Sequence, residues 1–181
     1  MATVADTRAT ALTGARLADY LQLTRPRLSA MALLTVAIGA ALASGGAPDW
    51  RVLTHTLIGT ALVAAGASVL NQLLECESDG LMCRTRARPL PSGRVRPGDA
   101  LVFGLASAVG GVVYLALTLP NPLAAALAAL TLLSYVVVYT PLKRMTTLNT
   151  LVGAIPGALP PVIGWAAVRY QEGVARNGDH R

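Results

Sequence analysis

Long stretches without a charged side chain are the feature that most constrains how this chain can fold. Residues 52–74, 100–142 and 145–168 contain no Asp, Glu, Lys or Arg, and the middle run is 43 residues long. A helix needs about 20 predominantly apolar residues to cross the hydrocarbon core of a bilayer. Charged residues make up only 13% of the chain, whereas a soluble domain has about 25%. The sequence therefore predicts an integral membrane protein and excludes a soluble globular domain.

Turn-forming residues divide the apolar runs into about five spanning helices. The first two are expected at residues 28–43 and 52–74. Pro120, Asn121 and Pro122 cut the long run into two helices joined by a tight turn. A fifth helix begins near residue 145 and contains three prolines. The predicted fold is an all-α, polytopic transmembrane helical bundle.

Basic residues lie in the short segments between these helices, which indicates how the chain is oriented. The net charge is +6, but this distribution fits membrane topology and anionic lipid headgroups, and we expect no nucleic acid partner. With five spans, the side that holds the N-terminus carries eleven Lys and Arg and the other side carries four. The expectation is a multi-pass protein of the cell (inner) membrane with a cytoplasmic N-terminus.

A polar segment after the second span holds the residues with the clearest chemical potential. Asn71, Glu75 and Asp79 follow one another at four-residue spacing, so on a continuous helix they lie along one stripe, and Glu77 points elsewhere. Carboxylates at a helix C-terminal end oppose the helix dipole and repel each other, so a positive partner is expected. Mg²⁺ commonly takes one or two carboxylates plus the oxygens of a substrate phosphate.

A second interpretation of this segment remains open at the level of sequence. The acidic residues could pair with the arginines that follow, Arg84, Arg86 and Arg88, in an ordinary solvated loop. The amide of Asn71 argues for a site or a helix contact, because it lies about one turn inside an apolar span. Cys76 and Cys83 are expected to be free thiols. His55, alone in its span, is expected to contact another helix rather than to bind heme.

Three motifs in order along the chain resemble one family of membrane enzymes. Arg25-Pro26-Arg27 precedes the first span, and Tyr139-Thr140-Pro141-Leu142-Lys143-Arg144 follows the fourth. Between them stands the most specific motif, Asn71-x-x-x-Glu75-x-x-x-Asp79-x-x-Met82-x-Arg84-Thr85-x-x-Arg88-Pro89-Leu90-Pro91-x-Gly93. Over residues 17–168, the chain resembles the protoheme IX farnesyltransferase (heme O synthase) family of the UbiA intramembrane prenyltransferases.

The resemblance implies a bundle of nine spans around a cavity, and this chain holds the first half of those spans. There farnesyl diphosphate binds through Mg²⁺, and its farnesyl group is added to a vinyl group of heme b. By the resemblance, Asn71, Glu75 and Asp79 hold Mg²⁺, while Asn71, Arg84, Arg88 and Lys143 bind the diphosphate. Tyr139 and Lys143 match the catalytic tyrosine and lysine that face the diphosphate.

The sequence departs from the family pattern after residue 168. The family's second acid-rich motif is absent, and residues 169–181 are polar, which predicts a truncated or frameshifted copy that is inactive by itself. We therefore expect a cytoplasmic segment at 1–27, a transmembrane prenyltransferase domain at 28–168 and an atypical tail at 169–181. A second half or a second copy could complete the site. The alternatives are a non-enzymatic membrane remnant, a helix-interaction protein or half of a small transporter.

Overall fold

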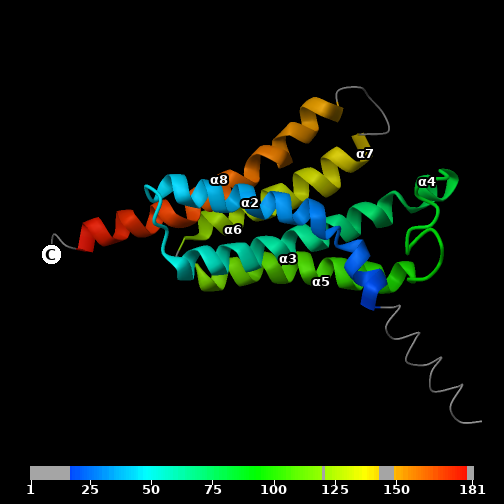
Figure 1. Cartoon of the computed structure of the whole chain (residues 1–181), viewed down its shortest axis with the longest axis horizontal. Coiled ribbons are helices and arrows are strands. Elements are labelled where there is room, and N and C mark those ends of the chain that lie inside the picture. The colour runs from blue at the N-terminus through cyan, green and yellow to red at the C-terminus, as the bar shows by residue number, and fades with distance from the viewer. Residues whose placement is uncertain (1–16, 120, 143–148, 179–181) are drawn as a thin grey trace, which may run out of the picture.

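A computed structural model describes residues 17–119, 121–142 and 149–178, and every regular element in these ranges is helical. After a short helical segment at residues 17–23, the elements are α2 (Pro26–Ala43), α3 (Trp50–Leu74), α4 (Cys76–Leu81), α5 (Pro97–Thr118), α6 (Pro122–Leu133), the π-helix η1 (Ser134–Tyr139), α7 (Thr140–Leu142) and α8 (Asn149–Gly178). The long helices lie side by side along one axis (Figure 1). The predicted all-α bundle is confirmed.

Four helical stretches are long and apolar enough to cross a membrane, by length and composition. They are α2, α3, α5 and the continuous stretch from Pro122 to Leu142. The expected break at residues 120–122 therefore does produce a helical hairpin. The fifth expected span corresponds to α8, which is outside that set of four but packs along α2 and α6 as part of the bundle. Because α8 continues to Gly178, no helix boundary separates residues 169–178 from the apolar residues before them.

The helix starts follow from local chemistry. Helices α2, α5 and α6 each have proline in their first turn, where its missing N–H leaves no helical hydrogen bond unmade. The Asp49 side chain accepts a hydrogen bond from the Arg51 amide at 2.9 Å, and Asn121 caps α6 through the Leu123 amide at 2.9 Å. Such caps satisfy backbone donors that a helix cannot satisfy itself.

Small residues let the helices approach closely. A Cβ added at Gly39 of α2 would overlap the Pro161 carbonyl of α8, and one added at Gly164 would overlap the Val36 carbonyl. The α2–α8 crossing is therefore closed to larger residues at both positions. Helices α3 and α5 meet in the same way at Gly66. In lipid, where burial of apolar surface drives little association, such close backbone packing holds helices together.

The two ends of the bundle are distinct. One end holds α4, the loop that follows it, α7 and the helical segment at residues 17–23 (Figure 1). The opposite end holds the α2–α3 and α5–α6 connections and the C-terminal part of α8 (Figure 1). We call the first the polar end, defined by residues 17–25 and 71–96, and the second the turn end, defined by residues 44–51 and 117–122.

Candidate functional site

The predicted stripe of Asn71, Glu75 and Asp79 lies on a buried face at the polar end. Helix α3 ends at Leu74 rather than continuing, and α4 begins at Cys76. The register nevertheless persists, because the Glu75 amide donates to the Asn71 carbonyl (3.0 Å) and the Asp79 amide donates to the Glu75 carbonyl (2.8 Å). The three residues are 2%, 8% and 6% exposed. Glu77 is exposed, as the spacing predicts.

The loop after α4 supplies a cation to this face. Arg88 pairs with the Asp79 carboxylate at 2.5 Å, and the Thr85 hydroxyl donates to the Asp79 carbonyl at 2.8 Å. Arg84 is exposed. The Arg88–Asp79 ion pair is of the kind expected for an ordinary solvated loop, but it differs from such a pair in its burial. The carboxylate is buried, and a buried charge is costly unless it has a partner.

Asn71 connects α3 to the π-helix. Its Nδ2 donates to the Thr140 hydroxyl at 3.0 Å, and that hydroxyl donates to the Tyr135 carbonyl at 2.8 Å. The π-helical turn gives Tyr135 and Tyr139 stacked rings, with centroids 5.6 Å apart and planes at 22°. Single π-helical turns are often found at functional sites. The side-chain amide of Asn71, which would be costly in lipid without a hydrogen bond, thus donates to Thr140, 69 residues away in the sequence.

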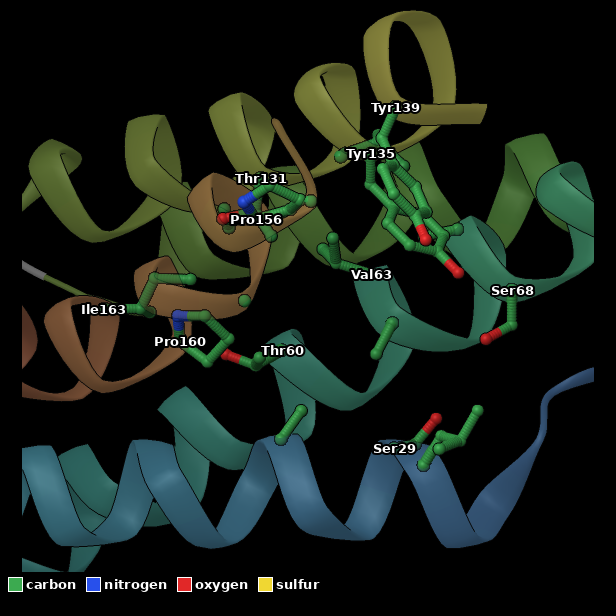
Figure 2. Close-up of a pocket in the computed structure, with 18 residues that line it drawn as sticks. Ser29, Thr60, Val63, Ser68, Thr131, Tyr135, Tyr139, Pro156, Pro160 and Ile163 are labelled. Atoms are coloured by element: carbon green, nitrogen blue, oxygen red, sulfur yellow. The ribbon is translucent and has the colours of Figure 1, made fainter. Parts of the chain in front are cut away.

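An apolar cavity of about 310 Å³ lies among α2, α3, α6, η1 and α8. Tyr135, Tyr139, Ser29 and Ser68 line one part of it, and the tyrosine hydroxyls point toward α3 near Ser68 (Figure 2). Asn71 follows Ser68 by about one helical turn on α3. The acidic stripe therefore begins about one helical turn beyond Ser68, toward the polar end.

Arg25 adds a further cation near these tyrosines. Its backbone has a φ of 48° in the left-handed region, the one such conformation among the described non-glycine residues. That conformation is costly, and especially so before Pro26. The Tyr135 hydroxyl lies within electrostatic reach of both Arg25 and Glu75. Arg25 and Glu75 thus lie near one of the two tyrosines that line the cavity.

A second ion pair fixes the polar end. Arg94 Nε donates to the Asp19 carboxylate at 2.8 Å, and Arg94 Nη2 donates to the Ala87 carbonyl at 3.1 Å. Gln72 Nε2 donates to the Leu23 carbonyl at 2.6 Å. Residues 17–23 are thereby bound both to α3 and to the segment that presents Arg88.

Sequence reasoning missed several of these residues. The sequence alone indicates no role for Tyr135, Thr140 or Asp19, because the residues that they contact are far away along the chain. A polar residue facing an apolar run is a signal that could have suggested Thr140. Tyr139 lines the cavity. Lys143 lies outside the described residues.

The two cysteines and His55 behave as simple structural residues. Cys76 and Cys83 are free thiols. Burial raises the pKa of the Cys76 thiol, and the charges of Asp79 and Glu77 raise it further. His55 Nδ1 lies 2.7 Å from the Tyr114 hydroxyl, so this histidine links α3 to α5 as expected.

The donor set at the polar end suits Mg²⁺ only in part. Among the described residues, no three His, Cys, Asp or Glu side chains gather as a complete metal site. Mg²⁺ that is bound together with a phosphorylated ligand commonly takes one or two carboxylates from the protein, and Glu75 and Asp79 are two buried carboxylates. The residues therefore fit a metal that is bound together with a phosphorylated ligand.

Comparison with known proteins decides the family. Residues 32–175 match the UbiA prenyltransferase family. This chain belongs to that family. The fold agrees, because a solved structure of digeranylgeranylglyceryl phosphate synthase in membranes superposes with a TM-score of 0.73 at 23% identity, covering 82% of this chain and 52% of that one.

Curated relatives of this UbiA family chain are similar over most of its length. The protoheme IX farnesyltransferase of Solibacter usitatus is 48% identical, covering 82% of this chain and 54% of the relative. Those of Azotobacter vinelandii and Myxococcus xanthus are 46% and 49% identical, each covering 84% of this chain and 51% of the relative. The chain spans about half the length of these relatives.

Proposed function

We propose that this chain forms the diphosphate-binding half of a membrane enzyme that transfers a farnesyl group from farnesyl diphosphate to a vinyl group of heme b, giving heme O. The observation that carries the proposal is the buried face of Glu75 and Asp79, which Asn71 joins through Thr140 to Tyr135 in the lining of an apolar cavity. Carboxylates are costly to bury, and an isoprenoid diphosphate has an apolar chain joined to a group that binds metal. The names of the relatives support the same reaction.

In this proposal, the chain's residues bind and orient the diphosphate. Asn71, Glu75 and Asp79 hold Mg²⁺, which supplies positive charge to the diphosphate oxygens when bound. Arg84 and Arg88 bind the same group from the loop after α4. Release of Arg88 from Asp79 upon metal binding would free its guanidinium for the diphosphate.

Tyr139 and Lys143 are the proposed catalytic residues. Cleavage of the bond between the first farnesyl carbon and the diphosphate oxygen leaves an allylic cation and a multiply charged leaving group. The allylic cation adds to the vinyl group of heme b, and the cation that this addition leaves on the heme side chain takes up water and loses a proton. Fixed donors aimed at the departing oxygens stabilise that charge most strongly in a water-poor cavity. The hydroxyl of Tyr139, at the polar part of the cavity, is suited to this role (Figure 2).

The remaining proposals concern placement and partners. We place the protein in the cell (inner) membrane with residues 1–27 and the loop that carries Arg84 and Arg88 on the cytoplasmic side, and residues 28–168 as the transmembrane domain. The rest of the cavity wall would come from a second half of the kind that the relatives contain, or from a second copy of this chain.

Heme O formation tests the proposal directly. The chain is co-expressed with the second half of the Solibacter usitatus relative, in cells that lack their own enzyme, and heme O is measured by chromatography. We expect Glu75→Gln and Asp79→Asn to lower turnover by ~100-fold or more, because each removes a charge that the metal and diphosphate require. Glu77→Gln, which removes an exposed carboxylate from the same segment, is the matched control. Unchanged turnover in both acid variants would exclude the metal role.

A further inference from the structure

The helical segment at residues 17–23, which precedes the first span, carries its polar and apolar residues on unusual sides. Asp19 points inward, is 8% exposed and accepts a hydrogen bond from Arg94 Nε at 2.8 Å. Leu17 and Leu21 are 66% and 57% exposed. A helix that faced water would bury its leucines and expose its carboxylate. The outer surface of this segment therefore suits an apolar environment.

The exposed surface of the segment has two faces. Leu17 and Leu21 are four residues apart and share one of them, which we call the leucine stripe. Ala18 and Gln22, also exposed and four residues apart, form a second stripe that has no large apolar side chain. An apolar stripe beside a more polar one is typical of a helix that lies in the plane of the membrane interface.

The leucine stripe forms one wall of an apolar groove of about 320 Å³. Tyr20 and Thr24 extend this wall, and Phe103 of α5 lines the groove from the other side. The Tyr20 ring meets the Phe103 ring edge-on, with centroids 5.2 Å apart and planes at 70°. The groove therefore lies between the segment and the first turns of α5.

Helix α5 sets the level of this groove in the membrane. It is one of the four stretches long and apolar enough to span a bilayer, and it begins at Pro97. Phe103 follows Pro97 by six residues, which is about 9 Å along the helix axis. Beside it on α5, Val102 and Leu105 are 69% and 46% exposed, and on a spanning helix such residues meet acyl chains. The groove is thus continuous with the lipid-facing surface of α5.

We propose that residues 17–23 dock on the membrane surface at the polar end, with an acyl chain of a phospholipid in the groove between the leucine stripe and Phe103. Ala18 and Gln22 then face the headgroups and water. Tyr20 suits this level, because tyrosine is enriched where a membrane meets water. The segment is therefore part of the membrane-bound body rather than a tail in the cytoplasm. The inference rests on the membrane fold and is independent of the proposed farnesyl transfer.

Fluorescence quenching from the two sides of the interface tests the docking. Single cysteines are introduced into a chain without its native cysteines, labelled with bimane and reconstituted in phosphatidylcholine nanodiscs. The variants are Leu17→Cys and Leu21→Cys on the leucine stripe, with Ala18→Cys and Gln22→Cys as matched controls. All four positions are exposed, so the substitutions leave the packing of the bundle intact.

Two quenchers distinguish lipid from water. We expect phosphatidylcholine brominated on its acyl chains to quench the labels of the leucine stripe about threefold more than the control labels, because only that stripe reaches the acyl chains. Iodide in the aqueous phase should quench the labels in the opposite order.

Three other results would overturn the inference. Quenching of all four labels by iodide, with little by bromine, would show that the segment lies in water. Protection of the leucine-stripe labels from both quenchers would show that protein covers the groove. Equal quenching of all four labels by bromine would contradict the orientation of the two stripes. Each of these results would leave the proposed farnesyl transfer standing, because the labels report only on the segment and its surroundings.

Discussion

The polar end and the turn end of this bundle use polar residues for different purposes. At the turn end, Asp49 and Asn121 cap helices, and Asn121 Nδ2 also donates to the Ala166 carbonyl of α8 at 3.0 Å. At the polar end, Glu75 is buried directly after the end of α3 and makes no side-chain capping bond to α4, and Asp79 is buried within α4. Carboxylates near a helix C-terminus are opposed by the helix dipole. Asp49 and Asn121 thus serve as helix caps, whereas capping does not account for the burial of Glu75 and Asp79.

Aromatic residues show the same contrast. Trp50 and Trp165 are 70% and 46% exposed, on helices that reach the turn end, and Arg169 lies 5.6 Å from the Trp165 ring. Exposed tryptophan is typical of a membrane–water interface. Tyr135 and Tyr139, by contrast, turn inward and line the cavity. The exposed tryptophans thus lie on helices that reach the turn end, whereas the two tyrosines line the cavity.

The largest predicted difference between the two ends is the side of the membrane on which each lies. Cys83, exposed at the polar end, should react with a membrane-impermeant maleimide only from the cytoplasmic side. In a chain without its native cysteines, Pro48→Cys at the turn end should react only from the other side. The reason is the excess of Lys and Arg in the segments of the polar side. Labelling of position 48 from the cytoplasm would reverse the proposed topology.

A smaller effect is expected from the ion pair that ties residues 17–23 to the loop. Asp19→Arg and Arg94→Asp should each accelerate maleimide labelling of the half-buried Cys76 by roughly fivefold, because loss of a partly exposed pair of this kind costs about 1 kcal/mol. The combined swap should restore the wild-type rate. Arg86→Asp, a charge reversal at an exposed position of the same loop, is the control.

The two single variants change the local charge in opposite directions. An electrostatic effect on the Cys76 thiolate could therefore not accelerate labelling in both. Acceleration in both, reversed by the swap, would show that Asp19 and Arg94 hold the loop closed. Wild-type labelling in both single variants would mean that the pair contributes nothing to the order of the polar end.

The smallest expected effect concerns the pKa of Cys76. Burial is the main cause of the raised pKa of this thiol, and the Glu77 charge is a minor one. Glu77→Gln should therefore lower the Cys76 pKa slightly and raise its labelling rate at pH 8 by less than about twofold, because more thiolate is present. The rate is followed against pH in a Cys83→Ser background. A slower rate would show that Glu77 acts on Cys76 by packing rather than by charge.

Much of the bundle was predictable because membrane spans depend on local properties. The uncharged runs predict the first residues of α2 and α3 to within two positions. The prolines predict that a new helix begins at Pro122. The four-residue spacing also predicts that Asn71, Glu75 and Asp79 share a face. That face survives the end of α3 at Leu74 because the backbone bonds continue across Glu75.

The rest depends on contacts between distant segments. Asp19 and Arg94 are 75 residues apart, and nothing in either local sequence indicates the other. The π-helix at Ser134–Tyr139 is likewise invisible in hydropathy, although it positions both tyrosines.

Binding of farnesyl diphosphate to the purified chain tests the central difference between the two ends most directly. Calorimetric titration is carried out with and without Mg²⁺ on wild type, Asp79→Asn and Asp49→Asn. We predict saturable, Mg²⁺-dependent binding that is weakened tenfold or more by Asp79→Asn. Asp49→Asn at the turn end, where asparagine still caps α3, should leave it unchanged. Equal affinity in wild type and Asp79→Asn would contradict the assignment of the polar end as the diphosphate site.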